Sequence, residues 1–445
     1  MGSGSSRSTS LRKVCADHRG GVNWLSLSPD GSYLLTCSED WTARLWSTSE
    51  QQCCMIFQGH ENYITSCHLE NDAAYTCSAD HSVRRWDLTT GGCTAVFKGH
   101  SSIVNKVLVT RGCLFSASYD RTARCWSVET GRQLQEFRGH RNCVLALAHF
   151  SSQDLLPEQV RDFLVTGSTD CTLKLWLVSD GRCYRTLRGH SGAILCLALD
   201  TANKALFSGS TDCTVRRWDL ATGEQTKVFR EHQGSIICLE LVSQQLYSGS
   251  ADRTVKCWLL DSGKCVRTYK SHKRTVSAIR YHSGLLFTGS GDACARAFDT
   301  KSGVLRRVFR GHTFIINCIQ IHNQLLYTVS HDGTLRVWDV RSVLEQDKET
   351  PRKNSQKGSL TRLCNNKIHN QLLYTVSHDG TLRVWDVRSV LEQDKETPRK
   401  NSQKGSLTRL CNNKVDCMWG SQAQRTERSS QAERELREQE SIKLV

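Results

Sequence analysis

This chain of 445 residues has little proline, no long apolar run and no apolar stretch at its N-terminus. It has only 4 prolines and no long low-complexity tract, which favours one large folded body with tails over domains joined by linkers. Its apolar runs are short, so the sequence predicts no transmembrane helix. The N-terminal stretch MGSGSSRSTS has no apolar segment, and we therefore expect no secretory signal.

The 22 cysteines include no C-x-x-C pair and are scattered along the chain. Without a secretory signal this distribution favours a cytosolic protein, whose reduced cysteines act as small buried hydrophobes. We therefore expect neither a disulfide framework nor a metal site, and no motif in the sequence indicates a cofactor.

One spacing recurs eight times. A His is followed after 20 to 30 residues by an Asp, and six residues later by a Trp or, once, a Phe. A period near 40 residues means that one supersecondary unit is copied along the chain. The eight sets are His18/Asp40/Trp46, His60/Asp80/Trp86, His100/Asp120/Trp126, His140/Asp170/Trp176, His190/Asp212/Trp218, His232/Asp252/Trp258, His272/Asp292/Phe298 and His312/Asp332/Trp338.

A single repeat predicts four short strands. In residues 232–269 an alternating run rich in β-branched residues covers 236–241, and further strands cover 246–248, 254–258 and 264–269. Turns separate them, the tightest around Asp252, whose carboxylate can bond the local backbone. Four antiparallel strands in about 40 residues are typical of a propeller blade.

The repeats resemble those of the WD-repeat family, with a Gly-His step as in Gly59-His60 and a closing Trp-Asp as in Trp86-Asp87. The resemblance covers about residues 11–340 and is specific because it recurs. It implies a hydrogen-bonded tetrad of side chains in each blade, for example His60, Thr76, Asp80 and Trp86, or His190, Ser208, Asp212 and Trp218. A His–Ser–Asp grouping is also known from hydrolases. Eight copies in one chain indicate architecture, however, and we expect no catalytic residue and no enzyme activity.

We therefore predict an all-β fold, an eight-bladed WD-repeat β-propeller with disordered N- and C-terminal tails. The predicted parts are a flexible leader (1–10), the propeller (11–340), a polar linker (341–367), a half-blade hairpin (368–387) and a polar tail (388–445). To close the ring, residues 12–16 should pair with residues 334–339, which removes free sheet edges. Blade seven should be the weakest, because Phe298 lacks the indole N–H that would complete the network of His272, Thr288 and Asp292.

The chain also contains a perfect duplication. Residues 321–367 recur unchanged as 368–414, either through a recent tandem duplication or through an error in the gene model. Two identical hairpins thus compete for one place in blade eight. Inserting the second would loop out about 47 more residues, so loop-closure entropy favours the first by on the order of 2 kcal/mol. We expect the first copy to dock and Leu373, Tyr374 and Trp385 of the second to be poorly buried.

The net charge of +15 raises the question of a nucleic-acid partner. The residue two before each strand-end aromatic is basic in all eight repeats, which spreads charge around the ring instead of clustering it. The aliphatic stems of such residues can cover apolar surface. We expect no nucleic-acid binding.

The predicted mouth of the ring offers candidate partner-binding residues. In relatives that read phosphopeptides, Arg lies five residues after the His or just before the Asp, but neither position holds Arg or Lys in any repeat here. The mouth instead carries an apolar arc of Leu145, Leu195 and Ile237, and Tyr119 precedes an Asp. Trp41 follows Asp40, where small or polar residues are usual, and an exposed Trp is a good anchor. Alternatively, the apolar residues are core between blades.

We conclude from the sequence that the protein is a monomeric, non-catalytic scaffold that presents a propeller face to one or more proteins or peptides. The alternative is a substrate-receptor subunit of a ubiquitin ligase, which the lack of an adaptor domain before the propeller weakens. The start of the chain fits M-G-x-x-x-[ST], so Gly2 is a possible myristoylation site. One acyl chain gives only weak, reversible membrane association, and we expect a cytoplasmic protein that is at most partly membrane-associated.

Overall fold

The structure is a computed structural model that describes residues 10–151, 161–345, 367–369, 372–376 and 382–386. The chain divides into two units, residues 1–351 and 352–445, and each is described by itself. Gly2 and most of the predicted linker and tail lie outside the described residues, as does the long loop of blade four at 152–160.

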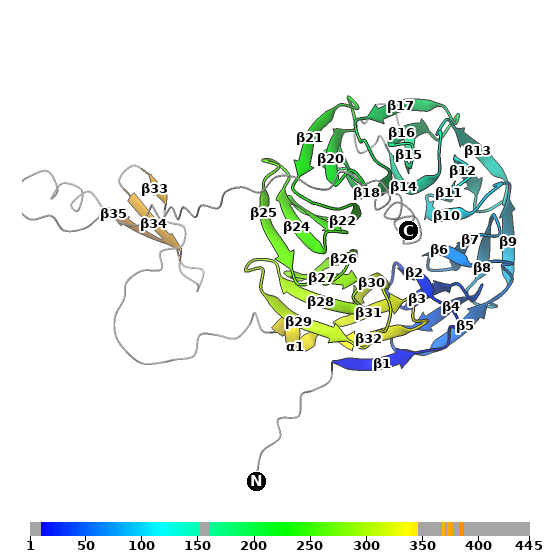
Figure 1. Cartoon of the computed structure of the whole chain (residues 1–445), viewed down its shortest axis with the longest axis horizontal. Helices are drawn as coiled ribbons and strands as arrows, with labels where there is room; N and C mark the ends of the chain where they lie inside the picture. Colours follow the sequence, from blue (N-terminus) through cyan, green and yellow to red (C-terminus); the bar gives the residue numbers. More distant parts are fainter. Residues whose placement is uncertain (1–9, 152–160, 346–366, 370–371, 377–381, 387–445) are drawn as a thin grey trace, which may run out of the picture. The chain divides into compact units, whose positions relative to one another are not determined.

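The first unit consists of eight four-stranded antiparallel sheets arranged as a ring (Figure 1). The first sheet runs outward from the ring axis in the order β2 (Val22–Leu27), β3 (Tyr33–Ser38), β4 (Ala43–Ser47) and β5 (Cys53–Phe57). The next three sheets are β6 (Ile64–Leu69), β7 (Ala73–Ser78), β8 (Ser82–Asp87), β9 (Cys93–Lys98); β10 (Val104–Thr110), β11 (Cys113–Ser118), β12 (Thr122–Ser127), β13 (Gln133–Arg138); and β14 (Val144–Ser151), β15 (Asp162–Ser168), β16 (Thr172–Leu177), β17 (Cys183–Arg188).

Three more sheets repeat the same order before the ring closes. They are β18 (Ile194–Asp200), β19 (Ala205–Ser210), β20 (Thr214–Asp219), β21 (Gln225–Arg230); β22 (Ile236–Val242), β23 (Gln245–Ser250), β24 (Thr254–Leu259), β25 (Cys265–Lys270); and β26 (Val276–His282), β27 (Leu285–Ser290), β28 (Cys294–Asp299), β29 (Leu305–Arg310).

The last sheet joins the two ends of the ring. Its three inner strands are β30 (Ile316–His322), β31 (Leu325–Ser330) and β32 (Leu335–Asp339), and its outer strand is β1 (Leu11–Cys15). Leu11 lies opposite Trp338 and Cys15 opposite Leu335. The predicted closure is therefore confirmed, and with it the all-β, eight-bladed propeller. A short helix, α1 (Arg341–Leu344), follows β32 and buries Val343, where the sequence suggested a polar linker.

The core lies between neighbouring sheets. Each inner strand begins with a Val or Ile that is at most 1% exposed, and each strand-end aromatic packs on the preceding blade. At the junction of blades one and two, Leu45 and Phe57 pack with Ile64 and Trp86, and the rings of Phe57 and Trp86 are 5.4 Å apart. A strand that buries both faces must be apolar on both, which explains why the second strand of each blade carries so few charged residues.

The second unit holds one three-stranded sheet in its described part, formed by β33 (Lys367–His369), β34 (Leu372–Val376) and β35 (Leu382–Asp386). Leu372 lies opposite Asp386, as Leu325 lies opposite Asp339 in the first copy, so the duplicated hairpin keeps its register. The first copy supplies β31 and β32 of the ring, as the loop-closure argument predicts. The sequence did not predict the short β33. The side chains of Leu373, Tyr374 and Trp385 lie outside the described residues, so their burial stays a prediction.

In the described part of the chain, no helix has the length and apolar character needed to cross a membrane. The described cysteines are free thiols. Many are buried, and burial raises the pKa of Cys77 to about 12, so such thiols are unreactive near neutral pH.

Candidate functional site

Each blade places its His and its Asp at the same end of the ring. In blade one, Val22 at the start of β2 lies opposite Ser38 at the end of β3, so the loop before β2 and the turn after β3 share one face. Because every blade repeats this topology, the ring has a face formed by these two loops of each blade. We call it the His–Asp face.

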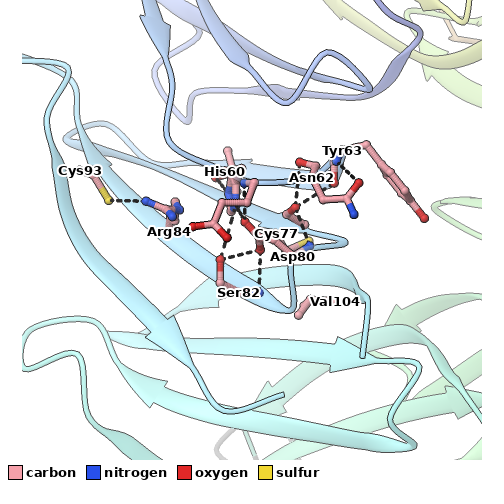
Figure 2. Close-up of polar contacts among 12 residues, drawn as sticks. His60, Asn62, Tyr63, Cys77, Asp80, Ser82, Arg84, Cys93 and Val104 are labelled. Atoms are coloured by element: carbon pink, nitrogen blue, oxygen red, sulfur yellow. Dashed lines mark hydrogen bonds and ion pairs between the residues drawn. The ribbon is translucent and has the colours of Figure 1, made fainter. Parts of the chain in front are cut away.

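The predicted tetrad of blade two forms one hydrogen-bonded network, and Figure 2 shows its His60 and Asp80 together with Ser82. The indole Nε1 of Trp86 donates to Thr76 Oγ1 at 2.8 Å. Thr76 Oγ1 lies 2.7 Å from His60 Nε2, and His60 Nδ1 lies 2.5 Å from Asp80 Oδ2. Since an indole N–H can only donate, the hydroxyl accepts from Trp86 and donates to His60 Nε2, which leaves the proton of His60 on Nδ1 to be donated to Asp80.

The network holds Asp80 ionised. Burial by itself would raise the pKa of Asp80, but hydrogen bonds from His60 and Ser82 outweigh it and hold the pKa well below the usual range. Ser82 donates to Asp80 Oδ1 at 2.7 Å, and the backbone N–H of Glu61 donates to Oδ2 at 3.1 Å. The carboxylate thereby ties the His loop to the turn between β7 and β8.

The second predicted tetrad has the same geometry. His190 lies 2.7 Å from Asp212 and 2.8 Å from Ser208, and Trp218 donates to Ser208 at 2.8 Å. In all seven blades that carry the Trp, the indole-to-hydroxyl distance is 2.8–2.9 Å. These His side chains are buried, at 7% exposure or less. A buried network repeated in each blade stabilises the loops and presents no single reactive group.

Blade seven departs further from the pattern than its Phe suggests. Cys294 replaces the hydroxyl residue that donates to the Asp in every other blade at 2.6–2.7 Å. Arg296 turns inward instead, is only 4% exposed, and donates to Asp292 Oδ2 at 2.8 Å and to His272 Nδ1. With no indole donor nearby, the hydroxyl of Thr288 is free to accept from His272 Nε2 at 2.7 Å. The ion pair of Arg296 with Asp292 thus stands in place of two hydrogen bonds of the other blades, from the Trp indole and from the hydroxyl residue that Cys294 replaces. Whether this blade is the weakest stays a prediction.

The apolar arc of Leu145, Leu195 and Ile237 interrupts a series of hydrogen bonds that link neighbouring blades. At the second position of the inner strand, polar side chains reach the backbone of the next blade: Asn23 donates to the carbonyl of Ile64 at 2.9 Å, and Asn317 to that of Val22 at 2.9 Å. Thr65, Asn105 and Ser277 make equivalent bonds. Blades four to six carry Leu145, Leu195 and Ile237 at this position. Leu145 is 8% exposed and adds little accessible surface, whereas Leu195 and Ile237 are half-buried.

The other two candidates also lie on the His–Asp face. Tyr119 is half-buried, and its backbone N–H donates to the carbonyl of Ile103 at 2.9 Å. Trp41 is 52% exposed and has a φ of +69°. Its counterparts in the other blades have positive φ too, so this turn position is left-handed in every blade, which suits small or polar residues better than Trp.

Sequence reasoning missed Phe314, which is 60% exposed in the loop before β30. Its ring lies 6.1 Å from His331, and His331 Nε2 lies 3.8 Å from Glu39 Oε2 in blade one. The His331–Glu39 contact thus bridges blade eight, which carries Phe314, and blade one, which carries Trp41. The signal was available, because an aromatic residue stands two after the His in this repeat alone.

Lys106 was also missed. Its Nζ lies 3.1 Å from the ring centroid of Trp24, two blades away, on the inner strands. Burial lowers the pKa of Lys106 to about 8, and the cation–π contact offsets part of that cost. Of the eight residues at this third position of the inner strand, Lys106 is the one charged residue.

The basic residues of several repeats bond within their own blade. Arg124 pairs with Glu136 at 2.7 Å, and Lys256 pairs with Glu231 at 3.2 Å. Glu231 stands where most repeats have the Gly of the Gly-His step. At Gly59 an added Cβ would lie 3.2 Å from Trp86 and 3.0 Å from Arg84, which explains the usual Gly. Among the described residues, no group of three or more His, Cys, Asp or Glu is arranged to hold a metal ion.

Comparisons with known proteins agree with this architecture. The family model "WD domain, G-beta repeat" matches residues 9–47, 51–87, 91–127, 131–176, 181–219, 223–258, 263–299, 303–339 and 353–386. The first eight stretches correspond to the eight repeats of the ring, and the ninth contains β34 and β35 of the second copy.

Two curated relatives match short stretches. WD repeat-containing protein 86 of Homo sapiens is 68% identical over 66 residues, or 15% of this chain and 18% of that protein. Nuclear distribution protein nudF 2 of Penicillium rubens is 44% identical over 57 residues, or 12% of each. The matches thus span less than a fifth of these relatives.

A solved structure matches far more of the chain. The crystal structure of the computationally designed Ika8 protein has a TM-score of 0.66 at 25% identity and covers 73% of this chain and 97% of its own. The repeated Gly-His and Trp-Asp steps, the tetrads, the closed ring and the family model lead to one conclusion: the chain belongs to the WD domain, G-beta repeat family.

Proposed function

We propose that the protein is a non-catalytic scaffold that binds a protein or peptide on its His–Asp face. Propellers of this family generally act as protein-interaction scaffolds and are generally non-catalytic. The residues that recur in every blade form the buried tetrad, so we expect a binding surface in residues that differ from blade to blade. On the His–Asp face those residues are the turn and loop positions around the tetrads.

The proposal rests on the exposure of Trp41. A side chain of this size buries a large apolar area when it meets a partner, and Trp is enriched at the energetic centres of interfaces. Here it is 52% exposed and occupies a left-handed turn position. A bulky residue at positive φ costs about 1 kcal/mol or more. We infer that the Trp serves a contact outside the chain.

Neighbouring residues extend the surface. Phe314 belongs to blade eight and Trp41 to the neighbouring blade one, and His331 and Glu39 make a polar contact across the junction of these two blades. Two exposed aromatic residues with polar groups between them suit a peptide or loop that supplies apolar side chains and backbone hydrogen bonds. Leu195 and Ile237 on the inner strands, and Tyr119 in the turn after β11, add half-buried apolar side chains to the same face.

The test is affinity capture from cell extract followed by mass spectrometry, with Trp41→Asp compared with the unchanged chain. Val304→Asp is the matched control, because Val304 is 55% exposed but lies in the turn between β28 and β29, on the opposite face. We expect Trp41→Asp to lose partners that Val304→Asp retains, with the same thermal midpoint for both. Capture that is equal for the two variants removes this site from consideration.

The finer assignments remain proposals. Ubiquitin-ligase subunits among the Trp41-dependent partners would make this propeller a substrate receptor, and their absence from that set would favour a plain scaffold. We propose a cytoplasmic monomer that binds no nucleic acid. Weak membrane association through Gly2 stays a prediction, because Gly2 lies outside the described residues.

A further inference from the structure

A polar cavity lies at the rim of the ring, where the first and last strands of the propeller meet. Its volume is about 650 Å³, and its lining includes Ser10, Arg12, Arg307, Asp339, Arg341 and Glu345. These residues come from the start of β1, from β29 of blade seven, and from β32 and α1, which lie side by side at the rim (Figure 1). None of them belongs to a tetrad or to the His–Asp face.

Two of the three arginines bind the same carboxylate. Arg12 Nε donates to Asp339 Oδ2 at 3.0 Å, and Arg341 Nε donates to both oxygens of Asp339 at 3.1 and 3.0 Å. The backbone N–H of Arg341 adds a bond to Oδ1 at 2.9 Å. Hydrogen bonds from Arg341 and then Arg12 hold the pKa of Asp339 well below its usual range, although burial opposes them. Asp339 is therefore a fixed single negative charge that faces two cations.

The third arginine has no such partner. Arg307 is half-buried on β29, and its side chain makes no hydrogen bond or ion pair to any residue that the structure describes. The cavity lining thus carries three guanidinium groups against the carboxylates of Asp339 and Glu345. A planar guanidinium offers several N–H donors in a fork that matches the oxygens of phosphate, so this excess of donors favours an anion with several oxygens.

We propose that this cavity binds a phosphate-class dianion, with Arg307 as its principal cation and Arg12 and Arg341 as secondary donors. One source lies on the chain itself, since Ser10 lines the same cavity. The backbone carbonyl of Ser10 accepts a bond from the N–H of Asp339 at 2.7 Å, so Ser10 is held at the cavity edge. The other source is a free phosphate group from solution.

The on-chain route is a phosphoryl transfer to Ser10 by a kinase. The hydroxyl oxygen of Ser10 forms a bond to the terminal phosphorus of a nucleoside triphosphate, the bond to the leaving nucleoside diphosphate breaks, and the hydroxyl proton is lost to solvent. The resulting phosphoserine carries close to two negative charges at pH 7. Its pairing with Arg307 would fasten β1, the closing strand, to blade seven as well as to β32, and would thereby slow opening of the ring.

The experiment compares full-length chains with serine and with genetically encoded phosphoserine at position 10, each with and without Arg307→Ala. Arg267→Ala is the matched control, because Arg267 holds the same place on β25 of blade six and does not line the cavity. The readouts are the phosphorus NMR titration of the phosphoserine and hydrogen exchange of β1. A Ser10→Ala chain titrated with inorganic phosphate tests the free source.

We expect the phosphoserine to titrate below its ordinary pKa of about 6 and β1 exchange to slow by about fivefold. Both effects should disappear in Arg307→Ala and persist in Arg267→Ala. An ordinary titration of the phosphoserine, combined with Arg307-dependent binding of inorganic phosphate to Ser10→Ala, would assign the cavity to a free phosphate instead. If neither form of phosphate responds to Arg307→Ala, the cavity is not a phosphate site.

Discussion

The duplicated hairpin allows a sharp test, because the two copies provide matched substitutions in identical sequence. Trp338 of the first copy is 2% exposed, donates to Thr328 Oγ1 at 2.9 Å and packs on Phe309 with ring centroids 5.6 Å apart. Replacing such a buried Trp by Ala costs about 3–5 kcal/mol. Trp385 holds the same place in the second copy. We expect Trp385→Ala to leave the stability of the ring unchanged, because β31 and β32 of the first copy already fill blade eight.

The two substitutions should not be additive. Loop closure favours the first copy by only on the order of 2 kcal/mol, which is less than the cost of Trp338→Ala. In that variant the intact second copy becomes the better occupant of blade eight, so the measured loss should stop near 2 kcal/mol. The double variant has no intact copy and should show the full loss of about 3–5 kcal/mol. Trp385→Ala alone is expected to have no effect, yet it should add to the loss in the double variant. Such coupling would show that the second copy replaces the first in blade eight.

Hydrogen exchange with mass spectrometry is the assay, and the reporting peptides must be chosen with care. Peptides from residues 321–367 and 368–414 are identical in sequence, so β1 and the start of β30, which pair with the hairpin and are unique, serve as reporters. A loss of 2 kcal/mol corresponds to about 30-fold faster exchange. Loss of β1 protection in Trp385→Ala alone would show that the second copy fills blade eight. A double variant no worse than Trp338→Ala would show that the copies are not interchangeable.

Two further predictions concern the tetrads. Their Asp residues have pKa values held well below the unfolded value of about 3.9, and burial lowers the pKa of His100, His272 and His312 below about 6.5. At low pH the unfolded chain therefore binds more protons than the folded chain. The stability should fall as the pH drops below about 6.5, through the His residues, and again below about 4, through the Asp residues. A urea midpoint that rises between pH 7 and pH 5 would contradict this. Arg296→Ala should lower the free energy of unfolding by about 3 kcal/mol, because it leaves Asp292 buried without its cation. Arg44→Ala at the same place in blade one is the control and should cost less than about 1 kcal/mol. Urea denaturation measures both.

The repeat made the fold predictable. The spacing of His, Asp and Trp, together with four short strands per unit, predicts the number of blades without any knowledge of contacts. Closure also follows from the sequence, since residues 12–16 are the remaining strand and β32 has the remaining free edge. The local pattern is sufficient here because each blade packs against neighbours of the same architecture. Once the strands of one blade are predicted correctly, those of the other blades follow.

The candidate site was less predictable because it depends on which side chains meet across blades. Asn23 and Asn317 occupy the same strand position as the apolar arc, and only the structure shows that they bond the backbone of the next blade. Leu145 looked accessible and is buried. Phe298 suggested a missing hydrogen bond, and only the structure revealed that Arg296 turns inward to replace it. A side chain's direction is decided by the neighbouring sheet, which the repeat pattern does not describe.

By itself the sequence determined the all-β class, the eight blades, the tetrad residues and the copy of the hairpin that enters the ring. Only the tertiary structure decided the rim cavity, because Arg12 and Asp339 are separated by 327 positions and Arg307 belongs to a third strand. The physical reason lies in the range of the interactions. Strand periodicity and turn chemistry act over a few residues and can be read locally, whereas a cavity at the closure of a ring exists only once the first and last strands of the ring have met.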